Sequence, residues 1–226
     1  MAKIETILVV GGGVAGLTAA TALHRHGFRT ELVERQQTWH ALGAGFLVHA
    51  NGIRMLLALG LAESVENAGT IVCRWQFCDE QGDLLSETDL EALWGDVGCC
   101  VGIERAKLQR ALLPGVANLR CRLGTSVSSL VQDDHHVSVG FSDGSTGDYD
   151  LVVGADGIKS TVRALTLTAA APSDLGGHEL AQHCPDPPRR LDRVADAPRR
   201  WLHVRACTHG RRTYVWFRVC RPASLS

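Results

Sequence analysis

The sequence predicts an α/β fold built around a parallel β-sheet. Three stretches indicate it: an apolar, β-branched run over residues 4–10 that ends in glycines, Ala and Leu at helical spacing over 14–26, and a second short run over 30–34. Strand, helix and strand in this order form a βαβ unit, in which the two strands are parallel. With 226 residues, of which 45% are hydrophobic, the chain can bury a sizeable core.

Further elements are predicted along the chain as far as about residue 176. Gly27 is expected to end the first helix, as the residue just beyond it. Helical periodicity marks residues 52–61 and 105–113. Strands are predicted at residues 71–78, 137–141 and 149–153, with the last apolar run continuing to Gly154, and Asp143-Gly144 is a hairpin turn signal.

A glycine-rich turn lies between the first predicted strand and helix. It reads Gly11, Gly12, Gly13, Val14, Ala15, Gly16, which matches the pattern G-x-G-x-x-G. Gly11 permits the tight turn, Gly13 lets the backbone approach a pyrophosphate, and Gly16 allows the helix to pack closely on the strand. The free N–H groups and the positive end of the helix dipole then face the phosphates.

Glu34 stands at the end of the second predicted strand, where an acid can accept hydrogen bonds from the hydroxyls of an adenosine ribose. The same carboxylate repels a 2′-phosphate, so NADP is disfavoured at this site. The alternative is a structural glycine turn beside a surface glutamate, but strand, turn, helix, strand and acid together favour a dinucleotide site. Both NAD and FAD use such a turn, so it does not distinguish them.

A second turn follows the apolar residues 151–154. Asp156-Gly157 turns the chain, and Ser160 can cap a following helix. The string from Gly154 to Arg163 resembles the D-G motif of the FAD-dependent monooxygenases of the aromatic hydroxylase type, the family of para-hydroxybenzoate and salicylate hydroxylases. Further matches to this family are Glu34-Arg35, Gly43-Ala44-Gly45, Asn51-Gly52, Leu59-Gly60-Leu61 and Arg105-x-x-Leu108-x-x-x-Leu112.

The resemblance implies a Rossmann-like FAD-binding fold with a parallel sheet and a partial β substrate region at residues 71–100. It also implies that FAD is reduced by NADH or NADPH and that one oxygen atom from O2 is delivered to a small aromatic substrate. The flavin-binding residues that it implies, besides the glycine turn and Glu34, are Arg35, Gly45, Arg105, Asp156 and Gly157.

Plainer alternatives exist for three of the residues near these motifs. Arg105 can be a solvated helix charge, and Asp156 can simply turn the chain. His49, near the flavin-side loop, can contact a substrate or serve only in packing. No catalytic base is identified.

Three functions are compatible with these motifs. The first is an FAD-dependent monooxygenase, the second an NAD-dependent dehydrogenase, and the third a catalytically inactive FAD- or dinucleotide-binding module. The dehydrogenase has no use for the D-G motif, and bound flavin would separate it from the other two.

Composition limits the partners. The formal net charge of −1 gives no basic field for nucleic acid, and the most apolar stretch is interrupted by the three glycines, so we expect no membrane anchor. The eight cysteines form no C-x-x-C pair and no export signal is present, so we expect reduced thiols, no metal site and a cytoplasmic location. The oligomeric state is not indicated.

The composition changes near residue 177. Residues 178–226 hold ten arginines, no lysine and five of the seven prolines. We therefore expect an FAD-binding domain over residues 1–177 and an irregular Arg- and Pro-rich tail over 178–226. The family's later Gly-Asp-Ala-Ala-His motif is missing, and we interpret the tail as the product of truncation or a shifted reading frame; a genuine short form is the alternative.

Overall fold

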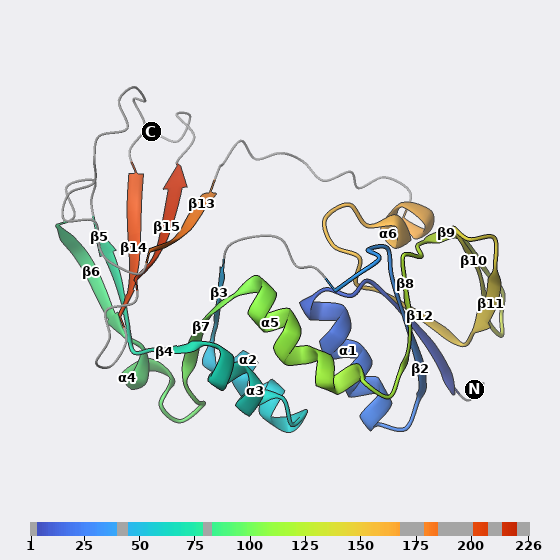
Figure 1. Ribbon diagram of the computed structural model, residues 1–226, viewed down its shortest axis with the longest axis horizontal. Coiled ribbons are helices and arrows are strands. Elements are labelled where there is room, and N and C mark those ends of the chain that lie inside the picture. The colour runs from blue at the N-terminus through green and yellow to red at the C-terminus, as the bar shows by residue number, and fades with distance from the viewer. Residues whose placement is uncertain are drawn as a thin grey trace. The chain divides into compact units, whose positions relative to one another are not determined.

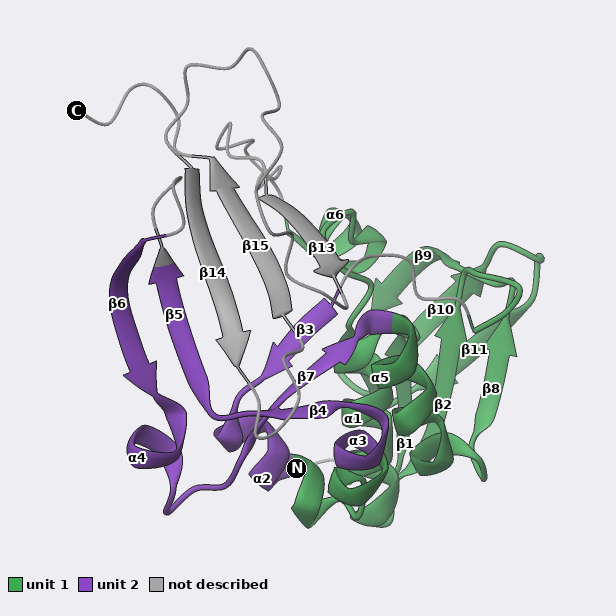
Figure 2. Ribbon diagram, turned by 60° about the vertical axis from the view of Figure 1, so that its left-hand side comes forward, with its two compact units in different colours: residues 1–42, 56–64, 106–172 green, residues 43–55, 65–105, 173–226 purple. Residues whose placement is uncertain are grey.

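A computed structural model describes residues 4–39, 45–78, 83–167, 179–184, 201–207 and 214–220. The chain divides into two compact units, coloured separately in Figure 2. Unit 1 consists of Met1–Leu42, Leu56–Ser64 and Ala106–Pro172, and unit 2 of Gly43–Met55, Val65–Arg105 and Ser173–Ser226. The domain boundary expected at residue 177 lies outside the described residues.

Unit 1 is built on a four-stranded parallel sheet, which confirms the predicted fold class. Its strands are β1 (Thr6–Val10), β2 (Arg29–Glu34), β8 (Arg120–Leu123) and β12 (Leu151–Gly154), in the order β12-β1-β2-β8 (Figure 1). All three pairings are parallel. The side chains of β1 from Ile7 to Val9 are at most 1% exposed, as expected for a strand covered on both faces.

Helix α1 (Val14–Arg25) packs on β1 and β2 through Gly16, Leu17, Ala20 and Thr21. It ends where predicted, because Gly27 adopts a φ of 88° and donates its N–H to the carbonyl of His24. Helix α5 (Arg105–Leu112) and the 3-10 turn η1 (Leu113–Val116) precede β8. Helix α6 (Thr161–Thr166) follows β12.

An antiparallel three-stranded sheet completes unit 1. It consists of β9 (Val127–Gln132), β10 (Val137–Phe141) and β11 (Thr146–Tyr149), and Val127, Val139, Phe141 and Tyr149 form one core with Leu8, Val10 and Val33 of the parallel sheet. The hairpin predicted at Asp143-Gly144 joins β10 to β11.

The apolar run at residues 151–154 is confirmed as strand β12, but the strand predicted at 149–153 is wrong at its start, because Tyr149 belongs to β11 and Asp150 separates the two strands. The Asp150 carboxylate accepts hydrogen bonds from the N–H groups of Glu5 and Thr6, at 2.9 and 2.7 Å. This contact directs the chain from one sheet into the other.

Unit 2 contains two antiparallel sheets. The first has the order β3-β7-β4, with β3 (Gly45–Val48), β7 (Cys100–Glu104) and β4 (Thr70–Val72). The second has the order β13-β15-β14-β5-β6, with β5 (Arg74–Cys78), β6 (Leu84–Asp89), β13 (Glu179–Cys184), β14 (Trp201–Cys207) and β15 (Tyr214–Cys220). Helix α4 (Leu90–Trp94) lies in this unit, whereas α2 (Ala50–Ala58) and α3 (Ala62–Ala68) contain residues of both units.

Two expectations for these segments need correction. The strand predicted at residues 71–78 is two strands, because the carbonyl of Cys73 accepts a hydrogen bond from the N–H of Leu90 instead of continuing the ladder. The tail is not irregular throughout, since β14 pairs with β5 and three of its segments are strands. The Trp, Val, Tyr and Phe residues of β14 and β15 favour strands, and four of the five prolines of the tail lie in the sequence between β13 and β14.

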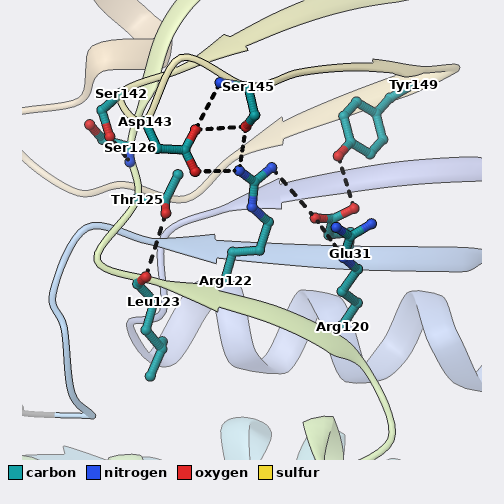
Figure 3. A network of polar contacts seen from close by, with 10 residues as sticks. All are labelled: Glu31, Arg120, Arg122, Leu123, Thr125, Ser126, Ser142, Asp143, Ser145 and Tyr149. Carbon is teal, nitrogen blue, oxygen red and sulfur yellow. Dashed lines mark hydrogen bonds and ion pairs between the residues drawn. The ribbon is translucent and has the colours of Figure 1, made fainter.

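A network of charged side chains joins the two sheets of unit 1 (Figure 3). The Tyr149 hydroxyl donates a hydrogen bond to Glu31 at 2.9 Å, and the guanidinium groups of Arg120 and Arg122 lie 3.6 and 3.9 Å from the other carboxylate oxygen. Arg122 also donates to Asp143 at 2.9 Å and covers the Phe141 ring. Burial, with the hydrogen bond to Glu31, raises the pKa of Tyr149.

Replacing Glu31 by alanine is expected to lower the free energy of unfolding by about 2–3 kcal/mol, because Arg122 loses a counter-charge and Tyr149 its acceptor. Tyr149→Phe, which removes one hydrogen bond, should cost about 1 kcal/mol. Urea denaturation at pH 7 measures both. A Glu31→Ala protein as stable as the parent would show that the network does not stabilise unit 1.

Candidate dinucleotide-binding site

The glycine turn joins β1 to α1 at the carboxyl end of β1, and two of its glycines are required by the backbone. Gly11 has a φ of 110°, and a Cβ built on it would overlap the carbonyl of Ala155. A Cβ on Gly16 would overlap the carbonyl oxygen of Gly11. Both positions therefore exclude a side chain, as the motif predicted.

Gly13 is different, because a Cβ built on it meets no described atom within 4 Å. It is the N-cap of α1, and no side chain of the described residues caps this end of the helix. The N–H groups of Val14, Ala15 and Gly16 therefore face a space that can accept an anion. A pyrophosphate fits this arrangement.

Glu34 ends β2 beside the turn. One carboxylate oxygen accepts the N–H of Gly12 at 2.5 Å, and the other accepts the N–H of Gln36 at 2.8 Å. Each oxygen keeps a lone pair for a ligand hydroxyl. Arg35 follows with an exposed side chain.

The second turn meets the first at the end of β12. The N–H of Ala155 donates to the carbonyl of Val10 at 2.7 Å, which places Ala155 and Asp156 against Gly11. The glycine turn and the Asp156 turn are therefore in direct contact in unit 1.

The Asp156 carboxylate is occupied by its own helix. It accepts hydrogen bonds from the Ser160 hydroxyl and from the N–H groups of Thr161 and Val162, at 2.5, 2.6 and 3.1 Å. Burial raises its pKa, but these hydrogen bonds outweigh burial and the net pKa is lowered. Ser160 caps α6 as predicted, by accepting the N–H of Arg163. Gly157 lies in the same turn with a φ of 81°.

Two residues near the turn were missed. The buried Gln109 of α5 donates its side-chain N–H to the carbonyl of Gly12 at 2.9 Å, and the ring of Trp39 lies against Gly12. In the sequence, the available signal for Gln109 was a polar amide at a position that helical spacing places on an otherwise apolar face of the predicted helix. Nothing in the local sequence indicated Trp39.

Gly45 and Arg105 belong to unit 2. Gly45 opens β3 and pairs with Glu104, and the Arg105 guanidinium lies 5.4 Å from the centre of the Phe46 ring. Gly43 and Ala44 lie outside the described residues.

His49 lies in a ring cluster of unit 2. Its ring stacks on Trp75, with 5.8 Å between centroids, and is tilted against Trp94 at 6.1 Å. Nδ1 of His49 and Nε1 of Trp75 are buried and have no hydrogen-bond partner in the described part of the chain. Most buried polar atoms in proteins have a hydrogen-bond partner, so these two nitrogens are exceptions.

The parallel sheet and the glycine turn at its carboxyl edge define a dinucleotide-binding protein of the Rossmann-like class. A family model described as "FAD binding domain" matches residues 4–180. The chain belongs to this FAD-binding family, which confirms the resemblance to flavin-dependent monooxygenases.

Curated relatives and solved structures agree with this assignment. A 3-amino-4-hydroxybenzoate 2-monooxygenase from Streptomyces cremeus is 35% identical over 164 residues, which is 70% of this chain and 41% of that protein. An FAD-dependent urate hydroxylase from Klebsiella pneumoniae is 31% identical over 163 residues, which is 71% of this chain and 42% of that protein. The chain thus spans about two fifths of the length of these relatives.

The structure of Klebsiella pneumoniae HpxO complexed with FAD and uric acid is 22% identical, with a TM-score of 0.73 over 98% of this chain and 58% of that chain. Tetracycline destructase Tet(55) is also 22% identical, with a TM-score of 0.66 over 100% of this chain and 58% of that chain. Both share the fold.

The described residues contain no group of three or more His, Cys, Asp and Glu side chains placed to hold a metal ion. None of the helices in the described segments has the length and apolar character needed to span a bilayer. Cys73, Cys99, Cys100 and Cys121 take part in no disulfide bond within the part of the chain that the structure describes.

Proposed function

We propose that this chain binds FAD through the β1–α1 turn and is part of a monooxygenase that uses NADH or NADPH and O2 to hydroxylate a small aromatic substrate. The observation that carries the proposal is the meeting of Gly11, Glu34 and the Asp156 turn at one edge of the parallel sheet. The relatives named above, a urate hydroxylase and an aminohydroxybenzoate monooxygenase, support the substrate class.

The residues of the turn account for cofactor binding. The first-turn N–H groups of α1 would hold the pyrophosphate, and Glu34 would accept hydrogen bonds from the ribose hydroxyls. Arg35 and Arg105 carry positive charge suited to the phosphates or the flavin. Asp156 acts indirectly in this proposal, because its carboxylate fixes the turn that packs on Gly11.

When bound, FAD would supply the redox chemistry with O2, and the protein would orient the substrate and exclude water. The buried nitrogens of His49 and Trp75 are the groups that we propose for orienting an aromatic substrate by hydrogen bonds to its oxygen or nitrogen atoms.

Replacing Glu34 by glutamine is expected to weaken FAD binding about 10-fold, because the ribose loses a charged acceptor while the amide oxygen still accepts the N–H of Gly12. Titration calorimetry with FAD measures the effect. Glu63→Gln, at an exposed glutamate of α3, removes the same charge and serves as the matched control.

The same titration tests the proposal itself. Failure of the parent chain to bind FAD would contradict it. A chain that retains yellow flavin but consumes no NADH or NADPH would indicate the inactive binding module instead.

A further inference from the structure

Gly12 is surrounded on three sides within unit 1. Its N–H is held by Glu34 and its carbonyl oxygen by Gln109. On the third side, a Cβ built on Gly12 would lie 2.6 Å from Cζ3 of Trp39 and 3.1 Å from Cβ of Glu34. Trp39 and Glu34 are thus neighbours at the same residue of the turn.

The position of Trp39 follows from the course of the chain after β2. The strand ends at Glu34, the next residues are exposed, and the half-buried Trp39 ring returns to the backbone of Gly12. An exposed loop commonly carries its large rings in solvent contact, but here the ring rests on the glycine turn.

We propose that Trp39 forms one wall of the adenosine part of the FAD site, a role that rests on the proposed function. A ribose hydroxyl that hydrogen-bonds to Glu34 must come within about 3 Å of its carboxylate. The Trp39 ring and the Glu34 side chain both lie against Gly12, so adenosine bound at that carboxylate comes close to the indole. An indole face is also a good stacking surface for adenine, since base–aromatic stacking is sequence-tolerant and strong.

The proposed contact with Trp39 involves only the adenosine half of FAD and not the flavin half. ADP contains the adenosine and pyrophosphate that reach Glu34 and Trp39, whereas FMN contains neither the adenosine nor the pyrophosphate. ADP therefore tests the contact directly. ADP also contains no flavin. Because a flavin quenches the emission of any nearby tryptophan by energy transfer, ADP gives an emission change that is easier to assign to Trp39.

The experiment measures ADP, FAD and FMN binding by calorimetry and the tryptophan emission of the chain during titration with ADP. Trp39→Leu removes the ring and is expected to weaken ADP and FAD binding about 10-fold. Trp39→Phe keeps a ring and should bind ADP within about threefold of the parent, but should lose most of the ADP-dependent emission change. Trp94→Phe, which removes an indole in unit 2, is the matched control and should keep that change.

The outcomes are distinguishable. If the parent binds neither FAD nor ADP, the proposed function fails and this inference fails with it. If the parent binds both, but Trp39→Leu binds them equally well and Trp39→Phe keeps the emission change, only the role of Trp39 is wrong. Thermal melting of each variant shows whether a loss of binding reflects unfolding, and the Phe variant remains informative if the Leu variant does not fold.

Discussion

Gly16→Ala is expected to prevent unit 1 from folding, whereas Gly13→Ala is expected to fold and to lose its cofactor. A methyl group on Gly16 would overlap the carbonyl oxygen of Gly11, and backbone atoms at a tight turn have little room to move. We expect a loss of more than about 3 kcal/mol in the free energy of unfolding.

The Gly13 methyl group, by contrast, meets no described atom. It should cost about 1 kcal/mol or less through the poorer N-cap. It would occupy the space in which we propose the pyrophosphate, so FAD affinity should fall about 100-fold. Circular dichroism melting and calorimetry with FAD measure the two effects separately. Equal melting temperatures for the two variants would contradict the packing role of Gly16.

Asp156→Ala is expected to destabilise the chain by about 2–3 kcal/mol, because it removes the acceptor of two backbone N–H groups and of the Ser160 hydroxyl. The free energy of unfolding is expected to decrease at acidic pH because of this carboxylate. The folded-state pKa of Asp156 is lower than its ordinary value of 3.8, so its contribution is present above about pH 4 and is lost as the pH falls toward the folded-state pKa.

Urea denaturation between pH 3 and 7 tests this. The parent should lose stability more steeply below about pH 4 than Asp156→Asn, which lacks the ionisable group. Asp134→Asn, at an exposed turn residue for which no role is proposed, is the control. Parallel curves for the parent and Asp156→Asn would rule out the carboxylate as a source of acid sensitivity.

The predictions that succeeded rest on short stretches of sequence. The glycine turn, the helix end at Gly27 and the Ser160 cap are each specified by residues within a few positions, and local backbone geometry leaves few alternatives for them. Family resemblance added the flavin and the D-G motif.

The missed features depend on contacts between distant parts of the chain. Gln109 reaches Gly12 across 97 residues, and Asp150 reaches Thr6 across 144. Trp39 is closer in sequence, but its place follows from the direction of a loop after β2. Strand periodicity could not show that Asp150 and Cys73 interrupt strands, because both interruptions come from tertiary hydrogen bonds.

The pairing of β1 with β12 has a consequence for the order of folding. Strand β1, α1 and β2 form a local unit that is complete once Glu34 has been synthesised, but β12 joins the other side of β1 only after residue 151 is available. Closing so long a loop costs entropy before any contact repays it, and such non-local pairings slow folding. The glycine turn and Glu34 can therefore form early on the ribosome, while the Asp156 turn joins them only after β12 has been made.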